Sequence, residues 1–144
     1  MTKANILLVD DEKRFVETMA KRLIKRGLNV ATSYSGEEAL EYIHVHPEVE
    51  VMVLDVKMPG MSGEAVLKEI KRYYPLIEVI MLTGHSNVFS GIEGMKMGAF
   101  DYLTKPCDID NLIAKVDEAA NKKRRHDEKI MKAHLREISS NRTQ

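Results

Sequence analysis

Five polar side chains that could do chemistry stand at or near the ends of short apolar runs: Asp10, Asp11, Asp55, Thr83 and Lys105. Adjacent carboxylates about 4 Å apart repel each other by roughly 1 kcal/mol in water, and by about 4 kcal/mol where the effective dielectric is near 20. A hard divalent cation would relieve that repulsion, and an incomplete cage of carboxylate and water oxygens suits Mg²⁺. The amine and the hydroxyl would then hold a phosphoryl group beside the metal. Because an Asp carboxylate can itself be the nucleophile, these residue types predict magnesium-dependent phosphoryl chemistry through an aspartyl phosphate.

These side chains need elements that bring them together, and the chain alternates apolar runs with segments of helical spacing. The runs typical of buried strands are Ile6–Val9, Leu28–Ala31, Val51–Leu54, Ile77–Leu82 and Phe100–Leu103. The helical signals between them are the apolar stripe Phe15–Ile24 ended by Gly27, the N-caps Ser35 and Ser62, the segment Asn87–Met97 ended by Gly98, and the N-cap Asp108. The chain therefore predicts five strands, each followed by a helix.

Strict alternation of strand and helix predicts an α/β fold, a doubly wound five-stranded parallel sheet with helices on both faces. Right-handed crossovers leave few orders for five strands, and the flavodoxin-like order 2-1-3-4-5 is favoured. Strands 1 and 3 are then neighbours, so we expect their terminal acids to lie close together. Ligands of such sheets bind at the carboxyl ends of the strands. The hydroxyl after strand 4 and the amine after strand 5 should therefore reach the same edge as the acids.

Four pieces of sequence at these strand ends resemble one known family. They are VDDE at the first strand, LDVKMPGMSG at the third, TGH at the fourth and FDYLTKP at the fifth. In this order and spacing they resemble the receiver domain of two-component response regulators, over roughly residues 4 to 120. The resemblance implies a signalling switch rather than a metabolic enzyme, because a receiver assists only its own phosphorylation and dephosphorylation.

The resemblance also implies a role for each residue of the cluster. Asp55 would accept a phosphoryl group from a sensor histidine kinase or a phosphotransfer protein. Lys105 would contact the phosphate, and Thr83 would turn towards it. The ligands of Mg²⁺ would be Asp10, Asp11, Asp55 and the backbone carbonyl of Lys57.

Residues around the cluster have implied roles as well. Tyr102 matches an aromatic that changes rotamer on phosphorylation, and the side chains of Lys57 and His85 would modulate the lifetime of the phosphate. The Lys105–Pro106 peptide bond is cis in the family. Phosphorylation would switch the binding of a downstream effector protein or domain through the face of the fourth helix, fifth strand and fifth helix.

Each of these residues also has a purely structural interpretation. Asp11 could cap the first helix, Asp55 could be a solvated turn residue, and Tyr102 suits the core side of a strand. The single cysteine, Cys107, allows no internal disulfide, and we interpret it as a small apolar filler in a reducing compartment.

Two other functions stay open and a third is excluded. A phosphorylation-independent adaptor would keep only the fold, although the complete cluster argues against it. A magnesium-dependent aspartyl-phosphate phosphatase of the haloacid-dehalogenase-like kind needs a D-x-D pair after an early strand, and this chain has adjacent Asp10 and Asp11 there. A dinucleotide-binding protein is excluded because the turn after the first strand, DDEKR, contains no glycine.

The last 24 residues differ from the rest in charge. The chain has 22 basic and 22 acidic residues, but eight basic and three acidic ones lie from Asn121 onward. We divide the chain into a receiver domain, residues 1–120, and a basic helical extension, residues 121–144, whose last six residues SSNRTQ should fray. A solvated helix is the favoured interpretation of this extension. The other is a contact with a partner through Ile130, Ala133, Leu135 and Ile138.

Partners and location follow from the same composition. A homodimer through the extension or the switching face stays open, and so does attachment to an ATPase-type transcription activator. The KKRR run would suit nucleic acid, but about 20 residues cannot hold a helix-turn-helix domain, so we expect no sequence-specific DNA binding by this chain. No apolar run approaches the ~18 residues of a membrane span. We therefore predict a cytoplasmic protein without membrane contact.

Overall fold

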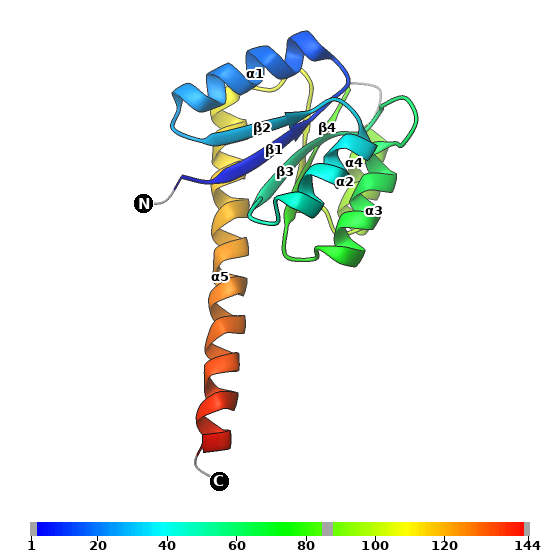
Figure 1. The fold of residues 1–144 in the computed structure, drawn as a ribbon. Coiled ribbons are helices and arrows are strands. Elements are labelled where there is room, and N and C mark those ends of the chain that lie inside the picture. Colours follow the sequence, from blue (N-terminus) through cyan, green and yellow to red (C-terminus); the bar gives the residue numbers. More distant parts are fainter. Residues whose placement is uncertain (1–2, 85–87, 143–144) are drawn as a thin grey trace.

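The computed structural model describes residues 3–84 and 88–142, which form a sheet covered by helices on both faces. Its strands are β1 (Asn5–Val9), β2 (Asn29–Ser33), β3 (Val51–Asp55), β4 (Glu78–Thr83) and β5 (Asp101–Thr104). All the pairings are parallel and the order is β2-β1-β3-β4-β5 (Figure 1). The predicted fold class and strand order are confirmed.

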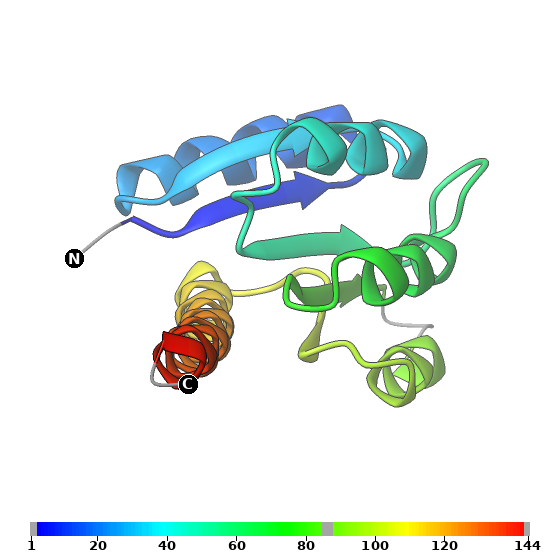
Figure 2. The same cartoon turned by 60° about the horizontal axis from the view of Figure 1, so that its bottom comes forward.

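Two apolar layers hold the helices on the sheet. The helices are α1 (Lys13–Lys25), α2 (Gly36–Val45), α3 (Gly63–Tyr73), α4 (Val88–Lys96) and α5 (Ile109–Arg142). Helices α1 and α5 cover one face, and α2, α3 and α4 cover the other (Figure 2). Successive side chains of a strand point to opposite faces. Thus Leu8 packs in the α1/α5 layer and its neighbour Leu7 in the other, both fully buried.

The helix starts follow the predicted caps in two cases and differ in a third. The hydroxyls of Ser35 and Ser62 accept hydrogen bonds from the backbone N–H groups of Glu38 and Ala65. Helix α1, however, has Glu12 at its N-cap position and no side-chain cap there. The structure thus does not support a capping role for Asp11.

The strands are shifted by about one residue from the apolar runs that predict them. Ser33 and Thr104 are polar, yet they pair with Val9 and Thr83 and so end β2 and β5. Leu28, conversely, is buried in the core just before β2 begins. An apolar run shows which residues are buried, whereas the limits of a strand depend on which residues pair in the backbone ladder of the sheet. The fourth helix begins at Val88, and Asn87, where we expected its start, lies outside the described residues.

Helix α5 is continuous from the sheet into the basic extension and projects from the body of the molecule (Figure 1). Arg124 anchors the base of the projecting part, with Nε 2.6 Å and Nη2 2.9 Å from the two carboxylate oxygens of Glu50. The helix then continues to Arg142, and the fraying that we expect of its last residues stays a prediction. Neither Gly nor Pro interrupts this stretch. No helix among the described residues is both long and apolar enough to span a membrane.

Candidate functional site

Three acids meet where β1 and β3 leave the sheet. Val9 and Leu54 are partners in the parallel ladder, so the residues that follow them, Asp10 and Asp55, emerge side by side. One carboxylate oxygen from each of Asp10, Asp11 and Asp55 lies within 4.8 Å of the others. Asp10 and Asp55 are buried, with 0% and 6% of their surface exposed, whereas Asp11 is exposed. The neighbouring strands thus create the acidic cluster that the strand order predicts.

The amine of Lys105 reaches into this cluster from the loop after β5. Its Nζ donates a hydrogen bond to Asp10 Oδ2 at 2.5 Å and lies 3.3 Å from Asp55 Oδ1. The backbone N–H of Lys105 also donates to the carbonyl of Thr83 at 2.6 Å. That bond fixes the loop to the end of β4, so the amine is directed at the carboxylates by the sheet itself.

Burial disfavours the ionised forms of the two buried acids, Asp10 and Asp55. Burial, with the neighbouring Asp10 carboxylate, raises the pKa of Asp55 from 3.8 to about 6, although Lys105 opposes this shift. Burial likewise raises the pKa of Asp10 despite the hydrogen bond from Lys105. Burial lowers the pKa of Lys105, but the hydrogen bond and charge of Asp10 outweigh it, so that pKa is raised overall. The cluster therefore has room electrostatically for a further cation.

Thr83 brings a hydroxyl to the same edge of the sheet. The residue is fully buried, and its Oγ1 has no hydrogen-bond partner among the described residues. Leaving a buried hydroxyl unpaired costs about 1–3 kcal/mol. A hydroxyl kept in this position is thus suited to a ligand that supplies an acceptor oxygen.

The remaining residues singled out from the sequence are placed less centrally. Tyr102 is half-buried and packs against the layer of α2, α3 and α4. Lys57 has an exposed side chain in the loop between β3 and α3. The Lys105–Pro106 peptide bond is cis. His85 lies outside the described residues.

Three residues with direct contacts to the cluster had no role in the sequence analysis. The Phe15 ring lies under Lys105, with Nζ 4.6 Å from its centroid, and Glu12 Oε1 lies 3.6 Å from the same Nζ. Gly63 starts α3 against the end of β3, where an added Cβ would lie 2.2 Å from the Asp55 carbonyl oxygen. The sequence marked Phe15 only as part of an apolar stripe and Gly63 only as part of a motif, since neither contact follows from spacing.

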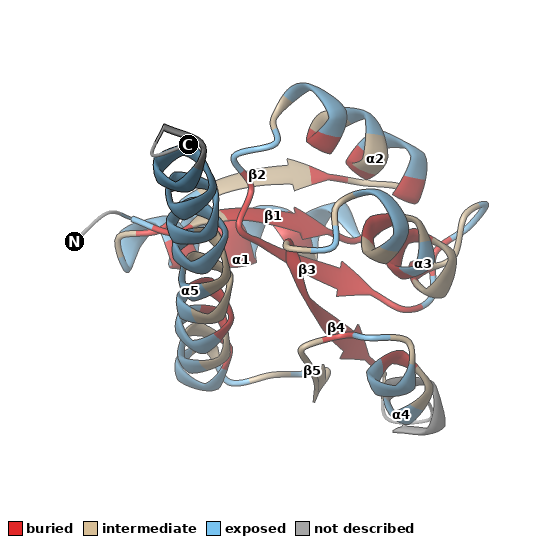
Figure 3. Cartoon of the chain, turned by 90° about the horizontal axis from the view of Figure 1, so that it is seen from below, coloured by how far each residue is buried: buried red, intermediate tan, exposed pale blue. Residues whose placement is uncertain are grey.

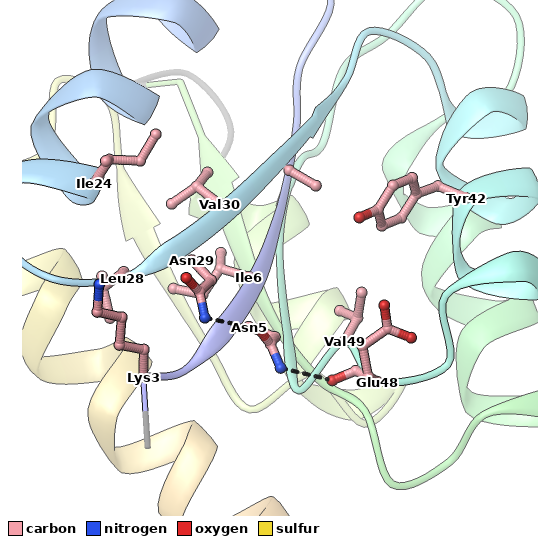
Figure 4. A pocket seen from close by; sticks show the side chains of 11 residues that line it. Lys3, Asn5, Ile6, Ile24, Leu28, Asn29, Val30, Tyr42, Glu48 and Val49 are labelled. Carbon is pink, nitrogen blue, oxygen red and sulfur yellow. Dashed lines mark hydrogen bonds between the residues drawn. The ribbon is translucent and has the colours of Figure 1, made fainter. Parts of the chain in front are cut away.

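A hollow elsewhere in the molecule lies away from these residues. It surrounds the edge strand β2 between α1 and α2, and Ile24, Val30, Tyr42 and Val49 line its apolar walls (Figure 4). Asn5 and Asn29, from the beginnings of β1 and β2, hydrogen-bond across it. The hollow lies at the end of the sheet opposite to the acidic cluster. None of Asp10, Asp11 and Asp55 lines it.

The acidic cluster fits a small divalent cation. Its donors are hard carboxylate oxygens from three residues, too few for a closed cage, so bound water or substrate would complete the coordination. A cation at this place would offset the charge crowding that raises the pKa of Asp55. A phosphoryl oxygen would accept a hydrogen bond from the unpartnered Oγ1 of Thr83. The carboxylates of Asp10, Asp11 and Asp55 are the donors that would hold Mg²⁺. The Lys57 carbonyl stays a further ligand expected from the sequence.

Comparison with known proteins gives a consistent result. A family model described as the response regulator receiver domain matches residues 6–117. The DNA-binding transcriptional regulator NtrC of Klebsiella pneumoniae is 39% identical over 112 residues, which are 78% of this chain and 24% of that protein. The transcriptional regulatory protein ZraR of Escherichia coli (strain K12) is 41% identical over 115 residues, or 80% and 26% of the two chains. The chain thus spans about a quarter of the length of these relatives.

One solved structure is matched by this chain over nearly the whole length of that structure. The crystal structure of a response regulator receiver domain protein from Clostridium thermocellum superimposes with a TM-score of 0.81 and 37% sequence identity. The match covers 84% of this chain and 97% of that one.

Proposed function

The chain belongs to the response regulator receiver domain family, and from this we propose that it is a phosphorylation switch with Asp55 as its phosphoacceptor. The donor is a phosphohistidine on a sensor kinase or phosphotransfer protein of the cytoplasm. The observation that carries the proposal is one edge of the sheet on which three carboxylates, the amine of Lys105 and the unpartnered hydroxyl of Thr83 converge. A receiver domain is a signalling switch, so the chemistry is a single turnover on the protein itself.

The reaction joins an oxygen of Asp55 to phosphorus. An Oδ atom forms the O–P bond while the N–P bond of the phosphohistidine breaks, and the imidazole leaves. Mg²⁺ would supply charge neutralisation between the attacking carboxylate and the phosphoryl oxygens. The ionised form of Asp55 is the nucleophile, and its pKa of about 6 leaves it ionised in the pH range of the cytoplasm.

Charge redistribution after transfer supports the switching role. A phosphoryl group adds about −1.5 to −2 charges and new acceptor oxygens. Lys105 Nζ is already 3.3 Å from Asp55, so a small movement brings it from Asp10 to the phosphate. Thr83 Oγ1 gains the acceptor that the described residues do not provide. Movement of Thr83 would open space for Tyr102, whose half-buried ring lies on the neighbouring strand.

The surface that responds is formed by α4, β5 and the start of α5. Ile92 and Met95 on α4 expose 45% and 40% of their surface, which makes them suited to an effector contact. The named relatives are transcriptional regulators. We accordingly assign the effector to the control of transcription, as a separate protein or as a domain joined to this one.

Incubation with acetyl phosphate and Mg²⁺, followed by intact mass measurement, tests the phosphoacceptor. We expect a labile gain of one phosphoryl group that EDTA prevents and that Asp55→Asn abolishes. An adduct that survives Asp55→Asn, or that forms equally in EDTA, would contradict the proposal. If no adduct forms, a beryllofluoride complex separates a short-lived phosphate, which gives one, from a phosphorylation-independent adaptor, which does not.

A further inference from the structure

The amine of Lys105 enters the acidic cluster from an edge strand. β5 lies at the edge of the sheet and is half-buried along its length, whereas β3 and β4 are buried throughout (Figure 3). Because β3 and β4 lie between β5 and β1, the side chain of Lys105 extends across the end of the sheet to meet Asp10. A lysine has a long flexible stem and a large conformational entropy. Contacts from outside β5 are therefore needed to hold the amine in one place.

The start of α1 supplies such contacts. Phe15 is the third residue of the helix, and the centroid of its ring lies 4.6 Å from Lys105 Nζ. Glu12, at the N-cap position, has Oε1 3.6 Å from the same nitrogen. Its backbone N–H also donates a hydrogen bond to Asp10 Oδ1 at 3.0 Å. The start of α1 thus contacts both the amine and the carboxylate to which the amine is hydrogen-bonded.

The position of the Phe15 ring is set by the packing of α1 on the sheet. The ring is half-buried and packs against the apolar layer of α1 and α5. The next residue, Val16, is fully buried, and its backbone N–H donates to the carbonyl of Glu12 at 3.0 Å. The ring is therefore a fixed surface against which the flexible side chain of Lys105 can rest.

The ring attracts the amine in a different way from the carboxylates. In the described part of the chain the amine pairs with the carboxylates of Asp10, Glu12 and Asp55. Of these, Glu12 faces solvent, with 67% of its side-chain surface exposed. The face of an aromatic ring attracts an ammonium group within about 6 Å of its centroid. This attraction needs no hydrogen bond that must break, so it persists while the amine moves from Asp10 towards a phosphoryl group on Asp55.

We propose that Phe15 is a positioning residue for phosphoryl transfer, whose ring holds the Lys105 amine inside the acidic cluster and keeps it from turning outward into water. The inference rests on the proposed function and adds a residue of α1 to it. Without the ring, the amine spends more of its time outside the cluster, and the rate of transfer falls with the fraction that is in place. Asp10 is then free of the amine more often, so Mg²⁺ binds at least as tightly as before.

Graded fluorination of the ring tests this attraction while the apolar packing is kept. Phenylalanine analogues with increasing numbers of ring fluorines, placed at position 15, weaken the negative potential of the ring face step by step. The rate constant of phosphorylation by acetyl phosphate with Mg²⁺ should fall at each step, by about tenfold in total. The same series at position 100 is the matched control. Phe100 is also half-buried, packs against the same layer and lies 5.6 Å from another ammonium group, that of Lys122.

Two ordinary substitutions give a second readout. Phe15→Leu keeps an apolar side chain on α1 and should slow phosphorylation about tenfold, whereas Phe15→Tyr keeps the ring face and should stay within about twofold of the wild-type rate. The dissociation constant of Mg²⁺, measured by isothermal titration calorimetry, should not rise in Phe15→Leu. A disordered site would instead weaken metal binding and slow phosphorylation together.

Consumption of acetyl phosphate follows the transfer whether the aspartyl phosphate is long-lived or short-lived. A wild-type chain that consumes none would overturn the proposed function and this inference with it. A wild-type rate that is unchanged by fluorination at position 15, or changed equally by fluorination at position 100, would overturn the role of Phe15 alone. Equal rates in Phe15→Leu and Phe15→Tyr, or weaker Mg²⁺ binding in Phe15→Leu, would overturn that role as well.

Discussion

Lys105 Nζ lies 2.5 Å from Asp10 Oδ2, closer than to the carboxylate that we propose as phosphoacceptor, which is 3.3 Å away. Asp10 is also a proposed ligand of Mg²⁺, so the amine and a bound metal would share one buried carboxylate. We therefore propose two roles for Lys105, as a partner of the phosphate and as a competitor of the cation.

Removal of the amine should strengthen metal binding. Lys105→Ala takes away a positive charge close to the metal position and frees Asp10, which we expect to lower the dissociation constant of Mg²⁺ about fivefold, or roughly 1 kcal/mol. Isothermal titration calorimetry measures this directly. Lys129→Ala on the projecting helix is the charge-matched control and should leave the constant unchanged. Weaker binding in Lys105→Ala would show that the amine organises the ligands instead.

Asp55 should make the metal-free protein less stable as the pH rises. Its pKa is about 6 in the folded protein, above the 3.8 of an unperturbed aspartate, so the folded state holds the proton more tightly. The favourable contribution is complete below pH ~4 and is lost as the pH rises through about 6. Asp55→Asn should then stabilise the chain by about 2–3 kcal/mol at pH 7.5, and by at least about 1 kcal/mol less at pH 5.

Urea unfolding in EDTA at the two pH values checks this dependence. The exposed Asp108→Asn serves as control and should show no such change. An equal effect of Asp55→Asn at both values would mean that the Asp55 carboxyl is not held in its neutral form by burial and the Asp10 charge.

Thr83→Val should weaken the switch response without destabilising the fold. The buried hydroxyl has no partner among the described residues, so replacing it by a methyl group removes its desolvation cost and should raise the free energy of unfolding by about 1–3 kcal/mol. Phosphorylation of Asp55 by acetyl phosphate should continue, but its effect on the α4/β5/α5 face should weaken. Amide hydrogen exchange of α4 with and without beryllofluoride measures that coupling. A full response in Thr83→Val would exclude the hydroxyl from the switch.

Gly63→Ala should disturb the phosphoacceptor through the backbone. The new Cβ would lie 2.2 Å from the Asp55 carbonyl oxygen and 2.8 Å from Val56 Cα, so α3 or the end of β3 must move. We expect a loss of about 2–4 kcal/mol in stability and slower phosphorylation. Gly94→Ala on α4 is the control, because its Cβ would meet the flexible Met81 side chain at 3.2 Å. Similar effects of both substitutions would argue against a specific contact at Gly63.

Residue order along the chain was enough to predict the strand order and the members of the acidic cluster. Alternating runs and helices predict a parallel sheet, and right-handed crossovers favour the order that brings Asp10 and Asp55 to adjacent strand ends, as the structure has them. These conclusions depend on chain order and hydrophobicity, both of which are local properties of the sequence. The Ser35 and Ser62 caps are predictable for the same reason, since each hydroxyl binds an N–H group three residues away.

Tertiary structure decided the features that depend on distances between segments remote in sequence. Lys105 lies 95 residues from its hydrogen-bond partner Asp10, and no spacing could tell that it lies closer to Asp10 than to Asp55. The stacking of Phe15 under that amine and the close approach of Gly63 to Asp55 arise only when the helices pack on the sheet. The hollow between α2 and α3, lined by Leu40, Val45, Glu69 and Tyr73 among others, is of the same kind, because its walls come from two helices whose relative position only the folded core sets.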